Sequence, residues 1–208
     1  MGMRGIDRYW LLTTTTYGAR LPGDPRGFVS NVRDDSGTGV RHNVPGTSQD
    51  ADMPNLQRWA GDALRCPAIR LIREQAAAIL AQFRETADHR DWLLLAVAIM
   101  ADHFHLVVGV PGDPEPAVLL RDFKSYASRA LNRRWPKPAS GTWWTESGSR
   151  RRLRDEAAVM TAIHYVSTQE FPLGLWTRDD GIGASPAGSG RQAPDDPPAA
   201  PAAAPTGG

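Results

Sequence analysis

Residues 92–110 read WLLLAVAIMADHFHLVVGV, and this stretch decides the fold. The continuously apolar run from Trp92 to Met100 predicts a central strand that is covered on both faces. Residues His103 to Val110 predict a second strand. Because the two runs are so close in sequence, an antiparallel hairpin is the natural connection between them.

Further strands and helices are expected on either side of this hairpin. Tyr9 to Thr16 is aromatic, apolar and threonine-rich, which predicts a first strand. The spacing of apolar residues predicts helices from Pro67 to about Thr86, from Pro116 onward, and from Leu153 to about Gln169. The order of these elements predicts an α+β fold with a central antiparallel sheet, in the ferredoxin-like split βαβ arrangement.

Two segments lack the pattern of a packed core. Residues 17–54 are rich in Gly, Pro, Asp, Asn and Ser, which predicts a long inserted loop. Residues 178–208 are mostly Ala, Pro, Gly, Ser and Asp, which predicts a disordered tail after a single domain over residues 1–177. The lone cysteine, Cys66, fits a reducing cytoplasm, and we expect neither a signal peptide nor a membrane span.

Positive charge is concentrated in one part of the chain. The formal net charge is only +1, but residues 121–154 hold ten basic and two acidic residues. Such a stretch is typical of a surface that binds phosphates, and tryptophans within it could stack on unpaired bases. The alternative is a solvated helix face followed by a basic loop. The candidate DNA-contacting residues are Arg121, Lys124, Arg129, Arg133, Arg134, Trp143, Trp144, Arg150, Arg151 and Arg152.

The histidines of the second strand form a candidate metal half-site. Alternation along a strand places His103 and His105 on one face and Phe104 on the other. The Phe104 face continues with apolar residues and is the better core face. Two imidazoles on one rigid face suit a metal ion. The alternative is a pair of ordinary histidines at the start of a strand.

A tyrosine on the last predicted helix supplies a candidate nucleophile. Tyr165 and Gln169 are four residues apart and share one helical face. That face lies away from the apolar stripe of the helix, so Tyr165 is free to face a cleft. A metal ion held by His103, His105 and the Gln169 amide oxygen would polarise a phosphate, which Tyr165 would attack. Mg²⁺ or Mn²⁺ suits such ligands. The alternative is a surface tyrosine that packs at the end of its helix.

These residues resemble the motifs of a known family. The sequence Asp102-His103-Phe104-His105 resembles the HUH motif of single-tyrosine HUH transposases, which include REP-associated tyrosine transposases and Y1-type insertion-sequence transposases. Residues 165–176, YVSTQEFPLGLW, are similar to the tyrosine helix of this family. Segments 15–27 and 144–149 resemble one of its branches. Ala101 and Glu170 depart from the family, since prolines are common at both positions.

The resemblance implies transposase-like, metal-dependent cleavage and rejoining of single-stranded DNA through a 5′-phosphotyrosine. It implies Tyr165 as the nucleophile and hairpin DNA as a partner in the cytoplasm, at the nucleoid. For Asp102 we expect a supporting role, in which it orients a ligand histidine. It leaves open a monomer or a homodimer. Two alternatives stay open: a cleavage-deficient or domesticated protein that binds structured single strands, and a phosphodiester hydrolase in which a metal-activated water is the nucleophile. Tyr126 is a second tyrosine candidate, but no polar ligand follows it four residues on.

Overall fold

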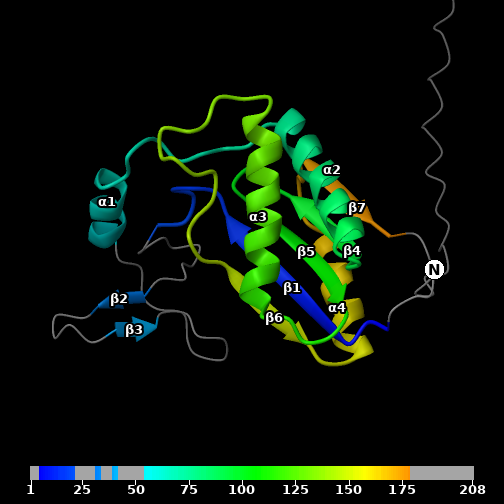
Figure 1. Ribbon diagram of the computed structural model, residues 1–208. Helices are drawn as coiled ribbons and strands as arrows, with labels where there is room; N and C mark the ends of the chain where they lie inside the picture. The colour runs from blue at the N-terminus through cyan, green and yellow to red at the C-terminus, as the bar shows by residue number, and fades with distance from the viewer. Residues whose placement is uncertain (1–4, 22–30, 34–38, 42–53, 179–208) are drawn as a thin grey trace, which may run out of the picture. The chain divides into compact units, whose positions relative to one another are not determined.

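An antiparallel sheet of five strands forms the centre of the protein. The structure is a computed structural model, and it describes residues 5–21, 31–33, 39–41 and 54–178. The sheet order is β6-β1-β5-β4-β7, and each neighbouring pair is antiparallel (Figure 1). The five strands are β1 (Arg8–Thr15), β4 (Leu93–Ile99), β5 (His103–Val110), β6 (Ser149–Leu153) and β7 (Gly174–Thr177).

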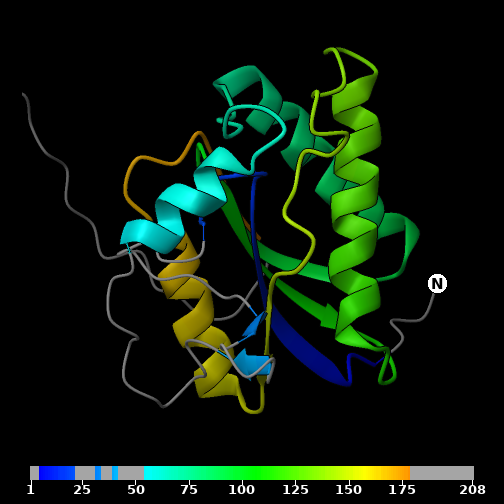
Figure 2. The same cartoon turned by 90° about the vertical axis from the view of Figure 1, so that its left-hand side faces the viewer.

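Helices cover both faces of the sheet. Helices α2 (Arg73–His89) and α3 (Pro116–Asn132) pack together on one face, and α4 (Glu156–Ser167) packs on the other (Figures 1 and 2). The connection from β1 through α2 to β4 skips one position in the sheet, and β5 occupies that position. The connection from β5 through α3 to β6 likewise passes over β1 and places β6 on its other side. This is the predicted ferredoxin-like split βαβ arrangement, which is therefore confirmed; β7 adds an edge strand that the sequence did not predict.

The predicted hairpin at residues 92–110 is confirmed as β4 and β5. The Met100 amide donates to the His103 carbonyl over 2.8 Å and closes the turn. On β5, the side chains of Phe104, Leu106 and Val108 enter the large core beneath α2 and α3. The histidines face the other side of the strand, toward α4. The face that carries Phe104 is thus the core face, as its apolar alternation predicts.

An aromatic cluster anchors the two helices to the sheet. Phe83 of α2 is fully buried and meets the rings of Phe104 and Phe123 edge-on, at centroid distances of 4.8 and 5.2 Å. Edge-to-face geometry is the favoured arrangement for such pairs. A smaller core on the opposite face joins Val159, Ala162 and Val166 of α4 to β4 and β5. The sheet is therefore packed on both sides.

Two helices have different boundaries from those predicted. Helix α2 begins at Arg73, because residues 67–72 are extended and give their hydrogen bonds to other segments: the Ile69 and Leu71 amides donate to Tyr17 and Ala101. Helix α4 begins at Glu156, after Asp155 accepts a hydrogen bond from the Ala158 amide at 2.8 Å. It ends at Ser167, so that Gln169 follows the helix instead of ending it.

Within the segment predicted as a long loop, residues 31–33 and 39–41 pair as the short antiparallel strands β2 (Asn31–Arg33) and β3 (Gly39–Arg41), and α1 (Pro54–Asp62) follows. The rest of residues 22–53 and the predicted tail from residue 179 lie outside the described residues. The domain boundary therefore stays a prediction. No helix of the described residues is long and apolar enough to cross a membrane.

The aromatic cluster yields a stability prediction. Replacing Phe83 by Ala should lower the free energy of unfolding by about 3–5 kcal/mol, because it removes a fully buried ring and leaves a cavity between two others. The matched control is Phe171→Ala, since Phe171 is 90% exposed and should change stability by less than about 0.5 kcal/mol. Urea unfolding followed by circular dichroism measures both. Equal effects of the two substitutions would contradict this description of the core.

Candidate active site

A pocket of about 420 Å³ lies between the start of β5 and the end of α4. Both histidines, Tyr165 and Gln169 line it, so the structure brings together the four residues that the sequence singled out. The remaining lining residues are mostly hydroxyl-bearing or basic: Thr13, Thr14, Thr15, Arg20, Thr145, Ser147, Gly148 and Ser149.

His105 is held from β1. Antiparallel pairing sets Thr13 opposite His105, and the Thr13 hydroxyl lies 2.6 Å from His105 Nδ1. Burial lowers the pKa of His105 to about 3, and the electrostatic effects of the neighbouring His103 and Arg20 act in the same direction. The imidazole is therefore neutral at physiological pH. With Nδ1–H donated to Thr13, the lone pair of Nε2 faces the pocket.

His103 is held by the residue before it. Its Nδ1 lies 2.5 Å from a carboxylate oxygen of Asp102. The hydrogen bond from His103 lowers the pKa of Asp102, against the opposing effect of burial, so that the carboxylate stays charged. A carboxylate that accepts from Nδ1 fixes the tautomer in which Nε2 is free to bind a metal. The two imidazole rings stand edge-on, with centroids 4.8 Å apart.

Tyr165 projects from α4 toward these rings. Its hydroxyl lies 3.4 Å from His105 Nε2, and the two ring centroids are 5.1 Å apart. The tyrosine is 45% exposed, whereas Val159, Ala162 and Val166 on the other side of α4 are buried in the core. The helix thus points Tyr165 away from its packed stripe and into the pocket, as its position on the helical wheel predicts.

Gln169 presents one side of its amide to the pocket. Its nitrogen donates to the Tyr165 carbonyl at 2.9 Å, which leaves the amide oxygen as an acceptor. Among the described residues, no three His, Cys, Asp or Glu side chains are grouped as a metal site. A third protein ligand for a metal ion at His103 and His105 would therefore be of another type. The Gln169 oxygen fits this need.

Two residues that line the pocket, Thr13 and Arg20, were not predicted from the sequence. Thr13 holds His105, and Arg20 places a positive charge that lowers the pKa of both His105 and Asp102. Thr13 could have been found only by knowing that the threonine-rich strand β1 pairs with the histidine strand β5. The sequence alone does not say which strands pair. Arg20 lies in the predicted loop, and the family resemblance of segment 15–27 assigned no role to this residue.

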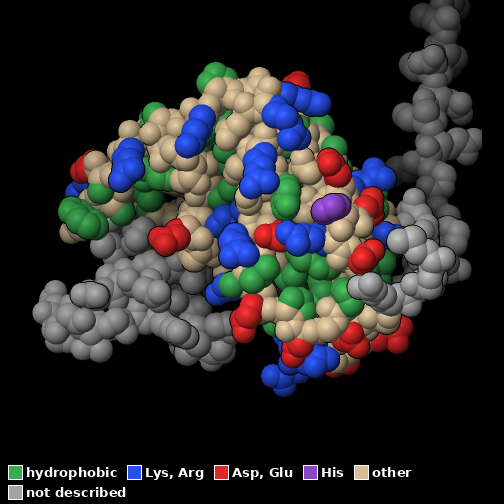
Figure 3. Space-filling model, viewed as in Figure 1, with side chains coloured by type: hydrophobic (Ala, Val, Ile, Leu, Met, Phe, Trp, Pro, Cys, Tyr) green, Lys and Arg blue, Asp and Glu red, His purple; other side chains and the backbone are tan. Residues whose placement is uncertain are grey.

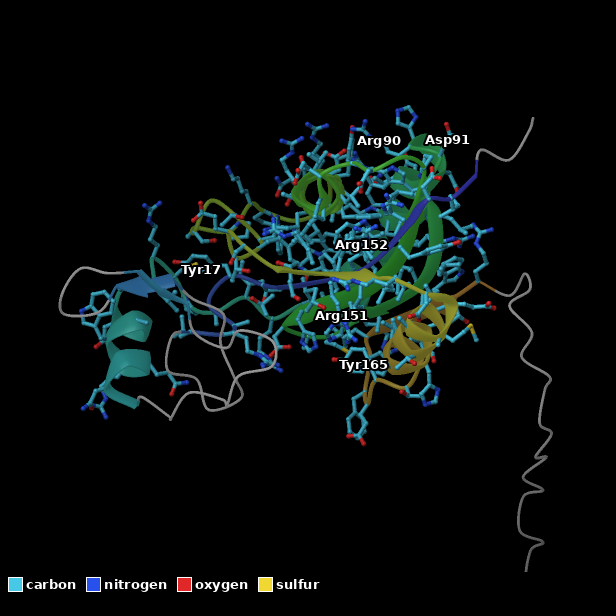
Figure 4. All side chains as sticks on the ribbon, turned by 90° about the horizontal axis from the view of Figure 1, so that it is seen from below. Tyr17, Arg90, Asp91, Arg151, Arg152 and Tyr165 are labelled. Atoms are coloured by element: carbon cyan, nitrogen blue, oxygen red, sulfur yellow. The ribbon has the colours of Figure 1, made fainter. Side chains whose placement is uncertain are left out.

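The edge strand β6 divides its arginines between the two faces of the sheet. Arg151 pairs with Leu11 and lies on the α4 side, as Tyr165 does, whereas Arg152 pairs with Trp10 and lies on the α3 side (Figure 4). Arg150 shares the face of Arg152. All three are exposed, so they remain candidates for contact with DNA.

Helix α3 carries a second group of exposed basic residues, and Figure 3 shows Lys and Arg side chains spread over the face on which this helix lies. The guanidinium of Arg129 lies over the ring of Tyr126, 5.0 Å from its centroid, and Arg133 donates to Gln82 at 3.0 Å. Tyr126 thus packs beneath an arginine, outside the pocket that Tyr165 enters. The exposed members of the group are Arg121 and Arg129 on the helix, and Arg133 and Arg134 directly after its end.

Three residues of the predicted DNA surface are used inside the protein. Trp143 and Trp144 are only 5% and 2% exposed, and their indole N–H groups donate to Asn132 and to the Lys124 carbonyl. The Trp144 ring meets Phe104 edge-on, at 5.4 Å. Their expected role in stacking on bases is therefore wrong, because the rings are buried in the core. Lys124 is also turned inward: its ammonium group donates to backbone carbonyls.

The chain was compared with curated proteins and with solved structures. A comparison with curated proteins finds no match. Among solved structures, one similar protein is a REP-associated tyrosine transposase bound to a REP hairpin, with 11% identity, coverage of 80% of this chain and 68% of that one, and a TM-score of 0.44. Another is a candidate transposase from Deinococcus radiodurans R1, with 14% identity, coverage of 80% and 94%, and a TM-score of 0.42.

The family comparison covers the four candidate catalytic and metal-binding residues of the pocket. Residues 70–169 match the model of the IS200-like transposases, and this region includes both histidines, Tyr165 and Gln169. The resemblance seen in the two sequence motifs is thereby confirmed. The part of the chain that carries the candidate active site thus matches the IS200-like transposase family.

Proposed function

We propose that this protein cuts and rejoins single-stranded DNA through a covalent bond between Tyr165 and a 5′ phosphate, assisted by a divalent metal ion at His103 and His105. One observation carries the proposal: the Tyr165 hydroxyl lies 3.4 Å from His105 Nε2, in a pocket that also contains His103 and Gln169. The transposase family of this region supports an enzyme that cuts and rejoins DNA.

The proposed cleavage step uses the phenol of Tyr165 as the nucleophile. Its oxygen forms a bond to phosphorus while the bond from phosphorus to the 3′ oxygen breaks. The phenol loses its proton, and the leaving 3′ oxygen gains one, which gives a 5′-phosphotyrosine and a free 3′-hydroxyl. Because one phosphodiester replaces another, a 3′-hydroxyl can reverse the step and join strands without ATP.

The residues of the pocket fit a divalent metal ion. When bound, Mg²⁺ or Mn²⁺ would act as a Lewis acid on the oxygens of the phosphate. His103 and His105 would hold it through their Nε2 atoms, because Asp102 and Thr13 bind the Nδ1 atoms. The Gln169 oxygen would complete the set. Asp102 would thus act through His103, not as a ligand itself.

The exposed arginines of α3 and β6 would bind the phosphates of the substrate. Arg151 lies on the side of the sheet that carries Tyr165, so it is suited to the strand that is cut. The family resemblance implies single strands flanked by hairpins, in which α3 would contact the paired part. A homodimer and an association with the nucleoid stay predictions.

The first test of this function is the covalent intermediate. Incubated with Mn²⁺ and labelled single-stranded hairpin DNA, the protein should form an adduct that survives denaturation. Tyr165→Phe should abolish it, since the substitution removes only the attacking oxygen, whereas Tyr126→Phe should leave it intact. Denaturing gel electrophoresis measures the adduct. Cleavage that persists in Tyr165→Phe would instead indicate a hydrolase that uses water. Salt-sensitive binding without any cleavage would indicate a DNA-binding protein.

The second test concerns the metal. Asp102→Asn should weaken Mn²⁺ binding roughly 10–100-fold, because an amide no longer accepts the Nδ1 proton of His103 with a full negative charge. Asp113→Asn is the matched control, since Asp113 is an exposed carboxylate that pairs with Arg8. Titration of the electron paramagnetic resonance signal of free Mn²⁺ measures both affinities. Unchanged affinity in Asp102→Asn would refute the positioning role of Asp102.

A further inference from the structure

Lys124 lies in the basic part of α3, yet its ammonium group is bound by the backbone of a neighbouring loop. The nitrogen lies 2.5 Å from the Thr145 carbonyl oxygen, 2.9 Å from that of Glu146 and 3.4 Å from that of Ser147. An ammonium group has three donors and no acceptor. These three consecutive carbonyls can therefore use all the donors of Lys124.

The loop is held to α3 by a second contact beside the lysine. The Trp144 indole N–H donates to the Lys124 carbonyl at 3.1 Å and lies 3.0 Å from the Ser128 hydroxyl. Consecutive carbonyls that converge on one point repel each other, so the ammonium group of Lys124 at that point offsets their repulsion and stabilises the bend. Lys124 thus stabilises the conformation of residues 145–147, and Trp144 holds the residue before them against α3.

The opposite side of the loop is held by β1. The Thr145 amide donates to the Thr15 carbonyl at 3.0 Å, and the Ser147 carbonyl accepts from the Thr14 hydroxyl at 3.0 Å. At Gly148 the loop approaches so closely that an added Cβ would lie 2.6 Å from the Thr13 carbonyl oxygen. The loop is therefore clamped between Lys124 and the strand that holds His105.

This loop forms one wall of the candidate active site. Thr145, Ser147 and Gly148 line the pocket with the two histidines and Tyr165. Thr145 also contacts the hydroxyl of Thr15, at 3.1 Å, and Thr15 pairs with His103 in the sheet. A shift of the loop would move these hydroxyls and disturb the strand beneath the histidines.

We propose that Lys124 is a positioning residue of the cleavage site: it holds the 145–148 loop in place as the wall against which the DNA phosphate is bound, and it does not contact DNA. The inference rests on the proposed function for its effect on cleavage. Its structural part stands on the three carbonyl contacts alone.

The chain has two lysines, Lys124 and Lys137, and substituting each of them tests whether Lys124 positions the loop or contacts DNA. Lys124→Met should slow adduct formation by bound hairpin DNA about 10–100-fold under single-turnover conditions, because a small displacement of the wall misplaces the phosphate. The affinity for DNA and its salt dependence should stay unchanged. Lys124→Arg should restore part of the rate. Lys137→Met is the matched control, since Lys137 is exposed and should leave rate and affinity unchanged.

Two measurements do not depend on activity. In the free protein, Lys137 should react with an amine-modifying reagent much faster than Lys124, as peptide mass spectrometry would show. Amide hydrogen exchange over residues 145–148 should be faster in Lys124→Met than in the wild type. The amine modification uses the wild-type protein, so it tests the contact between Lys124 and the loop even if Lys124→Met folds poorly. If the wild type forms no adduct, the proposed function and the effect of Lys124 on cleavage are refuted, whereas both of these measurements still test the structural role of Lys124.

Either of two results would overturn the inference. One is equal modification of Lys124 and Lys137 in the native protein. The other is a Lys124→Met variant that binds hairpin DNA more weakly, with a salt dependence reduced by about one charge, but cleaves the bound DNA at the normal rate. That second pattern would identify Lys124 as an ordinary phosphate contact.

Discussion

The antiparallel register between β1 and β5 is the constraint on which the candidate active site depends. It sets Thr13 opposite His105 and Thr15 opposite His103, so that each histidine faces a hydroxyl-bearing residue of the neighbouring strand. Because side chains alternate along a strand, a slip by one residue would turn both histidines into the aromatic core. The fully buried Phe104 ring between them opposes that slip, since it would have to leave its contact with Phe83.

One face of the sheet is packed into the main core, and the other face carries the candidate active site. Beneath β5, α2 and α3 provide a dense apolar core that makes the strand rigid. Above it, α4 buries only one side of its surface and leaves Tyr165 at the pocket. A phenol on a packed helix and imidazoles on a packed strand keep their separation without a ligand. Rigid elements of this kind hold catalytic groups more precisely than loops do.

Local patterns predicted the hairpin, the antiparallel sheet and the face of the histidines, because strand alternation depends only on neighbouring residues. Helical spacing placed Tyr165 and Gln169 together on a face away from the apolar stripe, and the family motifs supported the roles proposed for them. Thr13 and Arg20 could not be found in this way, since their roles depend on which strands pair and on where the chain passes after β1. The tryptophans were misjudged for the same reason: Trp143 and Trp144 lie among charges in the sequence but beneath α3 in space.

The charges of residues 121–154 show why a count of basic residues overstates a binding surface. Lys124 uses its charge on backbone carbonyls, whereas the arginines of β6 keep theirs exposed. These arginines lie on an edge strand, where charged side chains also discourage pairing with a second sheet. Alternation sends Arg151 to the side of Tyr165 and Arg152 to the side of α3. One edge thus offers positive charge on both faces, which suits the proposed binding of a DNA strand at the pocket and of paired DNA along α3.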